Sequence, residues 1–315
     1  MVSRSHQLGM DFLLFAVTFF WGATFIIVKN AVVYMDVYVF LGIRFGLAFM
    51  VMVVLFRKRI WPFHLPTALA GVFLGVFLFA AFAFQTWGLT HTSATNGAFL
   101  TGMNVVMVPI LSLIFLRRAP APFAVMGVML AFTGLYFLTG GGPSDWNRGD
   151  LLVFICAVWV SVHIMMTGYY APKFDTMALA TWQMGVVALL CMGFALGTGS
   201  FTLYVPPPAW GAILITAIFC TVFAFAVQTH AQRYTSPTRT ALIFTAEPVF
   251  GALFAHLYGG EPLLEQHLIG GGFIFVGMVL AEIRPGIWGR INGLRNGNRE
   301  KQSPSAKHPG DVFGE

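Results

Sequence analysis

The residue best suited to chemistry in this chain is a carboxylate inside a long apolar run. Glu247 stands directly before Pro248, in an apolar stretch from about residue 238 to about residue 258. At about 1.5 Å per residue from a first helical turn at Pro237, it lies about 15 Å into a bilayer whose apolar core is about 30 Å thick. A charge at that depth costs about 3 kcal/mol or more unless it faces protein or water. Glu247 is therefore a candidate for binding a substrate group or a proton.

Eight further side chains could share that site because they also stand within or beside apolar runs. Arg44 is an ionised residue well inside such a run, and Gln183 takes the equivalent position when Asp36 is aligned with Asp175. His163 can titrate near neutral pH. We expect the substrate-binding residues to be Trp21, Arg44, Asn96, Asn104, Trp159, His163, Gln183, Arg239 and Glu247.

Each candidate also has a structural explanation. Glu247 can bond a neighbouring helix, and Arg44 can hold backbone carbonyl groups. Arg239 stands close to the expected inner surface, where long basic side chains extend toward the lipid headgroups. The amides can join helices, and the tryptophans can fill the core. Binding and structural roles therefore stay open for all of these residues.

The residue pattern gives no indication of a metal, a cofactor or covalent chemistry. His91, His230 and His256 lack the spacing of metal ligands, and the three cysteines stand singly in apolar runs. The glycine runs at 140–142 and 270–272 lack the Lys-Ser/Thr pair of a phosphate loop. We expect no catalytic residue, no metal and no cofactor.

The elements that must position these side chains are membrane spans. Hydrophobic residues make up 57% of the chain and charged residues only 10%, which is typical of an integral membrane protein. We expect ten helical spans, at about 11–29, 36–56, 67–87, 94–116, 121–139, 150–168, 176–197, 209–228, 237–258 and 262–283. Residues 1–10 form a short N-terminal segment before them, and 284–315 a disordered basic tail after them.

The distribution of Lys and Arg predicts the orientation. If both termini lie inside, every Lys and Arg falls on an inner segment or the tail, except Arg44 within a span and Lys29 and Arg148 outside. Inner loops carry such an excess of positive charge. We therefore expect a multi-pass protein of the bacterial inner (plasma) membrane with both termini in the cytoplasm.

The two halves of the chain echo each other. When the halves are aligned without a gap so that Gln85-Thr86 falls on Gln228-Thr229, Thr92-Ser93 falls on Thr235-Ser236. The same alignment places Asn96 on Arg239 and Asn104 on Glu247. Each half holds five spans, so the second half enters the membrane the opposite way up. This predicts two inverted repeats, at 11–139 and 150–283, related by an axis in the membrane plane.

Over about 11–283 the chain resembles the EamA family of the drug/metabolite transporter superfamily. The resemblance rests on Phe20-Trp21-Gly22, Phe25, Lys29, Arg44-Phe45, Thr92-Ser93-Ala94, Pro109, Gly127, Gly134, Ala246-Glu247-Pro248-Val249, Gly260-Glu261, Gly270 and Gly277. One departure is Arg118, where the first repeat often has a glutamate matching Glu261. The resemblance implies a ten-helix transporter with a cavity between its halves, often an exporter of amino acids or other small metabolites.

We therefore expect an all-α integral membrane protein that acts as a secondary transporter by alternating access. Its expected partners are a small-molecule metabolite and membrane lipid, without nucleic acid. A coupled proton and a homodimer stay open. The alternative is an integral-membrane enzyme acting on a lipid-linked substrate, although Asp145, Asp150, Glu261 and Glu265 show no catalytic signature.

Overall fold

The computed structural model describes residues 4–61, 63–117, 119–138, 146–202, 204–260 and 262–281. Within those ranges every regular element is helical, which confirms the expected all-α membrane fold. The expected tail at 284–315, the glycine run at 140–142, and Arg118, Asp145 and Glu261 lie outside the described residues.

The helices follow the expected spans, but three of those spans are divided. The first half contains α1 (Arg4–Ala31), α2 (Val37–Ile60), α3 (Leu65–Leu89), α4 (Ala94–Gly102), α5 (Asn104–Leu116) and α6 (Pro122–Leu138). The second half contains α7 (Arg148–Tyr170), α8 (Thr176–Gly197), α9 (Pro207–Ala217), the π-helical turn η1 (Ile218–Phe223), α10 (Ala224–Ala231), α11 (Pro237–Phe244), α12 (Ala246–Gly259) and α13 (Glu265–Ala281).

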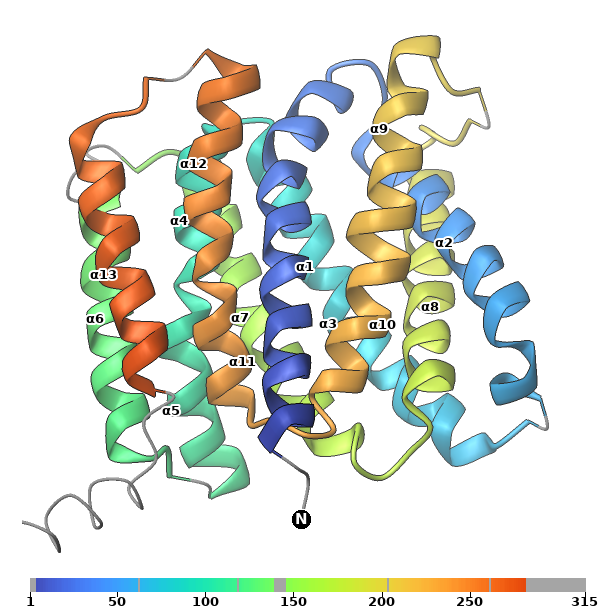
Figure 1. Cartoon of the computed structure of the whole chain (residues 1–315). Coiled ribbons are helices and arrows are strands. Elements are labelled where there is room, and N and C mark those ends of the chain that lie inside the picture. Colours follow the sequence, from blue (N-terminus) through green and yellow to red (C-terminus); the bar gives the residue numbers. More distant parts are fainter. Residues whose placement is uncertain are drawn as a thin grey trace, which may run out of the picture.

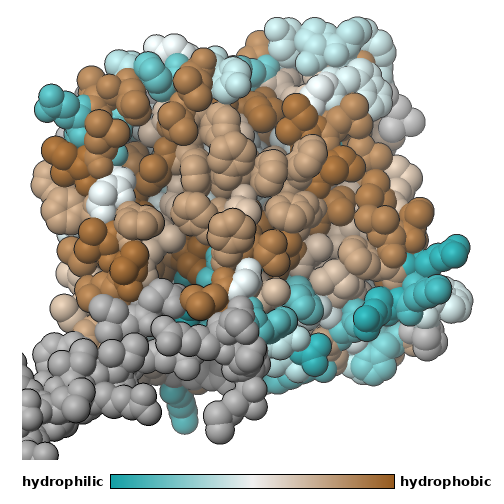
Figure 2. All heavy atoms as spheres, in the orientation of Figure 1, coloured by the Kyte–Doolittle hydropathy of each residue, from teal (hydrophilic) through white to brown (hydrophobic). Residues whose placement is uncertain are grey.

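Among the described residues, eight helical segments are long and apolar enough to cross a membrane, when α4–α5, α9–α10 and α11–α12 each count as one. The other two expected spans coincide with α6 and α13, whose described parts have 17 residues each. That length is at the lower end of what a bilayer requires. Apolar side chains cover the middle of the molecule, while hydrophilic ones gather along its lower edge and at its top (Figure 2).

Side-chain caps start several helices at matching places in the two halves. Asp36 accepts hydrogen bonds from the first backbone N–H groups of α2, and Asp175 does the same for α8. Ser93 caps α4 and Ser236 caps α11, each accepting from the N–H three residues later. These N–H groups have no partner inside their own helices, so a polar cap is needed where a short connection enters a helix.

The breaks at α4–α5 and α11–α12 have similar backbone geometry. Met103 has φ −60° and ψ −12°, and Thr245 has φ −65° and ψ −11°. A regular α-helix has a much more negative ψ. Pro248 accounts for the second break, because it has no N–H for the carbonyl of Phe244 and its ring crowds that turn. A candidate residue stands in the first turn after each break: Asn104 is the first residue of α5 and Glu247 the second residue of α12.

The helices form one bundle in which distant parts of the chain pack together (Figure 1). α1 lies against α12, α2 against α8, and α3 against both α7 and α8. α6 pairs with α13 through glycines: a Cβ at Gly134 would lie 2.5 Å from the carbonyl oxygen of Gly270, and one at Gly127 would lie 2.6 Å from that of Gly277. These small residues let the two helix backbones approach closely.

Candidate functional site

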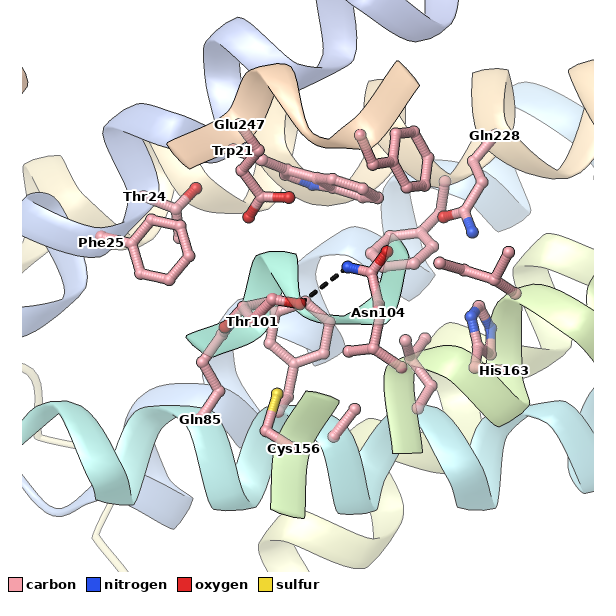
Figure 3. A pocket seen from close by; sticks show the side chains of 17 residues that line it. Trp21, Thr24, Phe25, Gln85, Thr101, Asn104, Cys156, His163, Gln228 and Glu247 are labelled. Atoms are coloured by element: carbon pink, nitrogen blue, oxygen red, sulfur yellow. Dashed lines mark hydrogen bonds between the residues drawn. The ribbon is translucent and has the colours of Figure 1, made fainter. Parts of the chain in front are cut away.

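A cavity lies inside the bundle beside the breaks at α4–α5 and α11–α12 (Figure 3). Its volume is about 50 Å³, which is room for a few water molecules. The lining comes from both halves of the chain and consists of Trp21, Thr24, Phe25, Leu78, Ala81, Phe82, Gln85, Thr101, Asn104, Cys156, Val160, His163, Ile164, Phe225, Gln228, Phe244 and Glu247.

Glu247 is the carboxylate of this lining. It is the second residue of α12, so the break at Thr245 and the ring of Pro248 fix its position. The residue is 8% exposed, and its carboxylate points into the cavity beside Trp21 (Figure 3). Among the described residues it makes no hydrogen bond or ion pair, and the lining contains no Lys or Arg. The site therefore holds an acid without a basic partner.

Two amides add hydrogen-bond acceptors to the lining. Asn104 donates through Nδ2 to the carbonyl oxygen of Thr101 at 2.8 Å, and its Oδ1 is buried without a donor in the described structure. Gln228 donates through Nε2 to Oε1 of Gln232 at 3.2 Å, and its own Oε1 likewise has no donor among the described residues. Gln232 in turn donates to the carbonyl oxygen of Ile164 at 2.8 Å, which fixes both glutamine orientations.

Aromatic rings form one wall of the cavity. The Trp21 indole donates through Nε1 to the carbonyl oxygen of Cys220 at 2.9 Å. Its ring centroid lies 4.9 Å from that of Phe244 and 5.5 Å from that of Phe225. Phe225 also contacts Phe82 at 5.9 Å. The indole is thus held in place, and its neighbours give the wall an apolar and electron-rich surface.

His163 lies at the far side of the cavity, and Gln183 holds it there. The distance from His163 Nε2 to Gln183 Oε1 is 2.7 Å. Gln183 also donates to the carbonyl oxygen of Leu179 at 3.2 Å, so the amide oxygen is the end that faces the imidazole. Gln183 does not line the cavity itself. It positions a side chain that does.

Arg44 is buried, but it does not line the cavity. Its Nε donates to Thr221 Oγ1 at 2.9 Å and its Nη2 to the carbonyl oxygen of Cys220 at 3.5 Å. The guanidinium carbon lies 4.9 Å from the ring centroid of Phe82 and 5.2 Å from that of Phe45. Of the two functions considered for it, the geometry matches the structural one, holding backbone and ring groups.

The remaining expected residues lie away from the cavity. Trp159 stacks on Phe77 at 5.9 Å, and Asn96 stands in the first turn of α4, where its backbone N–H bonds Ser93. Arg239 pairs with Asp11 at 2.5 Å near the start of α1. Four of the nine expected residues therefore line the cavity: Trp21, Asn104, His163 and Glu247.

The sequence prediction omitted two lining residues that the repeat itself marks. Gln85 donates to Thr101 Oγ1 at 3.2 Å, and Gln228 provides one of the open acceptors. These two glutamines coincide in the gap-free alignment of the two halves. Their match in the alignment indicates equivalent positions in the two halves. An amide side chain inside an apolar run also indicates a polar site, so the two signals together could have identified both residues.

Comparison with known proteins agrees with this architecture. The EamA-like transporter family matches residues 8–140 and 147–282. An uncharacterized transporter of Archaeoglobus fulgidus is 32% identical over 278 residues, which is 88% of this chain and 87% of the relative. The uncharacterized transporter YyaM of Bacillus subtilis is 26% identical, over 87% of this chain and 94% of its own.

A solved crystal structure superposes with a TM-score of 0.72, covering 89% of this chain and 97% of the other. Its sequence identity is 17%, so it shows the fold alone. The family and the names of the relatives indicate transport rather than catalysis. The chain, a multi-pass membrane protein, belongs to the EamA-like transporter family.

Proposed function

We propose that this protein is a secondary transporter that moves a small metabolite with a protonated amine and an apolar part, such as an amino acid or a related amine. The observation that carries the proposal is the central cavity, in which Glu247 has no basic partner among the described residues. The resemblance to its family favours export across the plasma membrane.

The chemistry of the cavity favours an ammonium group. An ionised carboxylate this deep in the membrane is costly unless a cation accompanies it. The same cavity is lined by Asn104 and Gln228, whose amide oxygens Oδ1 and Oε1 lack donors among the described residues. An ammonium group carries one positive charge and three N–H donors, which matches one carboxylate and two further acceptors. The face of Trp21 attracts a cation as well, and the phenylalanines contact the apolar part of the substrate.

Alternating access is supported by the way the two halves correspond. α1 begins at the lower end of Figure 1, whereas α7 begins at the upper end. The packing between the halves is also reciprocal. The first helix of each half lies against the broken helix of the other: α1 against α12, and α7 against α4 and α5. The first helix of each half also lies against the third span of the other: α1 against α10, and α7 against α3. We infer two inverted five-helix repeats that rock about the cavity between them.

Matching contacts join the two halves of the chain near each end of the molecule. At the upper end Thr92 donates to Asp150 at 2.5 Å, and Lys29 donates to the carbonyl oxygen of Thr92 at 2.8 Å. At the lower end Arg239 donates to Asp11 at 2.5 Å. The alignment that places Asp36 on Asp175 also places Asp11 on Asp150. We infer that these contacts alternate, one opening while the other holds.

Transport of amines into proteoliposomes tests the proposal. Wild-type protein should exchange a radiolabelled amine, and a panel of amines should compete while carboxylic acids without an amine should not. Glu247→Gln keeps nearly the same volume but removes the charge. Losing a charged hydrogen bond costs about 1.5–3 kcal/mol, so apparent affinity should fall about ten- to hundredfold.

Glu265→Gln is the matched control, because Glu265 is an exposed carboxylate at the start of α13. It should transport as wild type does. If amines still exchange but a pH gradient no longer drives their accumulation in Glu247→Gln, the carboxylate carries a coupled proton. Unchanged transport of every amine by Glu247→Gln, at normal abundance, would refute the cavity as the substrate site.

A further inference from the structure

A second pocket lies at the lower end of the molecule, separate from the central cavity. Its walls come from the end of α2, the start of α3, the connection from α7 to α8, the first turns of α8 and the segment after α10. Its volume is about 360 Å³. It therefore has room for a group the size of a phosphate without any rearrangement of the bundle.

Positive charge predominates in this pocket. Arg59, Lys173 and Arg233 line it, together with the carboxylate of Asp175. That carboxylate is already engaged: Oδ1 accepts from two backbone N–H groups at the start of α8, at 3.1 and 3.0 Å. Its Oδ2 lies 3.4 Å from Nη1 of Arg59. Three basic side chains face one carboxylate, so the pocket keeps an excess of positive charge.

Two of the cations have no acid to neutralise them within the described ranges. Lys173 and Arg233 form no ion pair with a described carboxylate. The Lys173 ammonium lies 3.1 Å from the ring centroid of Tyr169, and the guanidinium carbon of Arg233 lies 5.9 Å from that of Tyr234. Contact with a ring face leaves N–H donors available for an anion.

Aromatic side chains place the pocket at the depth of the lipid headgroups. Trp182 lines the pocket, and Phe63 meets it edge to face with ring centroids 5.8 Å apart. Trp61, in the connection between α2 and α3, is 77% exposed. Tryptophan gathers at the membrane–water interface. Hydrophilic side chains cover the end of α2 in the same region, at the lower right of Figure 2.

We propose that this pocket binds a phosphate-bearing anion, supplied by the headgroup of an anionic phospholipid. Arg59, Lys173 and Arg233 donate to the phosphate oxygens, and Trp182 contacts the glycerol and the first acyl carbons. Basic pockets between membrane helices bind such headgroups. Because the walls come from both halves of the chain, the bound lipid joins the two halves. The simpler explanation, a group of solvated charges that only sets topology, predicts no such preference.

Thermal unfolding of the purified full-length protein in detergent tests this site without any transport assay. Phosphatidylglycerol should raise Tm by several degrees more than phosphatidylcholine does. In the double variant Lys173→Gln/Arg233→Gln the apparent affinity for phosphatidylglycerol should fall about twenty-fivefold, at about fivefold for each cation removed. The control Arg57→Gln/Lys58→Gln removes the same charge from exposed positions of α2 outside the pocket and should keep the response.

Inorganic phosphate, titrated in the same way, distinguishes the two sources of the ligand. A response to phosphatidylglycerol that phosphate does not reproduce assigns the pocket to lipid, and the reverse assigns it to a soluble phosphate compound. The charge-conserving variant Lys173→Arg/Arg233→Lys should retain the response of wild type. Equal responses in the pocket variant and the control, or no response of wild type to either ligand, would overturn the site.

Discussion

At the residue scale, Arg44 shows how a buried charge can serve the fold rather than a ligand. It is 0% exposed, and its hydrogen bonds end on Thr221 and Cys220. Both residues belong to η1, where the π-helical turn departs from the regular helical hydrogen-bond pattern. The guanidinium supplies donors at that turn and rests on two aromatic rings. Arg44 thereby fixes α2 against the turn that also carries the hydrogen bond of Trp21.

Replacement of Arg44 by lysine should therefore destabilise the protein. Lysine keeps the charge, but its ammonium group lacks the planar set of N–H donors with which the guanidinium bonds Thr221 and Cys220 while it stacks on the aromatic rings. Loss of one charged hydrogen bond costs about 1.5–3 kcal/mol, which should appear as a clearly lower Tm of Arg44→Lys in detergent. Arg57→Lys, at an exposed position of the same helix, should leave Tm unchanged. A normal Tm together with a selective loss of transport would instead place Arg44 in substrate binding.

The comparison of Arg44 with Glu247 shows what sequence can predict at this scale. Both residues interrupt apolar runs, so their burial was predictable from the cost of a charge in the membrane. The direction of each side chain was not, because it depends on how each helix is rotated against partners far along the chain. The partners of Arg44 lie 176 and 177 residues away. Gln85 and Gln228 were recognisable only as an equivalent pair.

At the scale of the elements, the two end contacts are candidates for the gates of transport. Asp150 is 0% exposed and belongs to a capping box with Asn147, so it is fixed at the start of α7. Asp11 and Arg239 join α1 to α11 at the opposite end. Each contact links the first helix of one half of the chain to the broken helix of the other half, close to its capping serine. Weakening one contact should favour opening at that end alone.

The native Cys156 can report this opening, because it lines the central cavity and is buried. In a background with Cys191 and Cys220 replaced by alanine, the otherwise unchanged protein should react slowly with a membrane-impermeant maleimide. Asp150→Asn should speed labelling from the side of the upper end, and Arg239→Gln from the other side. Loss of a partly buried contact worth about 1–2 kcal/mol corresponds to about a five- to thirtyfold change in the open population. Equal labelling from both sides in both variants would argue against paired gates.

The pairing of α6 with α13 gives a second prediction at this scale. A Cβ at Gly134 would lie 2.5 Å from the backbone oxygen of Gly270, and backbone cannot move aside cheaply. Gly134→Ala should therefore lower stability by about 1–3 kcal/mol, seen as a lower Tm or reduced abundance in membranes. Gly272→Ala is the control, since nothing lies within 4 Å of its added Cβ. It should be neutral or slightly stabilising, because alanine favours helix over glycine.

The helices were more predictable than their breaks. The apolar runs and the caps Asp36, Ser93, Asp175 and Ser236 marked where helices begin. Pro248 marked the break at Thr245, but the break at Met103 has no proline directly after it, and η1 contains none. At Met103 the side chain of Asn104 donates to the carbonyl oxygen of Thr101, and in η1 that of Thr221 donates to the carbonyl oxygen of Thr216. Such bonds stand at both breaks, but a polar side chain inside an apolar run does not by itself predict a break. The three interrupted segments all contribute to the lining of the cavity.

At the scale of the whole molecule, charge and repeat support one orientation. Arg57, Lys58, Arg59, Lys173 and Arg233 all lie at the end where α1 begins, at the bottom of Figure 1. Arg148 lies at the start of α7, at the opposite end. The proposed five spans in each half would place the start of α7 at the end opposite to the start of α1, as Figure 1 shows. An excess of Lys and Arg marks the cytoplasmic side.

Cysteine accessibility in intact cells should confirm this orientation. Single cysteines at Lys58 and at Arg148, both exposed and at opposite ends, are placed in a background with the three native cysteines replaced. An impermeant maleimide should label Arg148→Cys in intact cells and Lys58→Cys only after permeabilisation. A periplasm-active reporter fused to the C-terminus should likewise give no signal. Labelling of both cysteines from the same side would require an even number of spans between them, and would overturn the inverted arrangement on which alternating access rests.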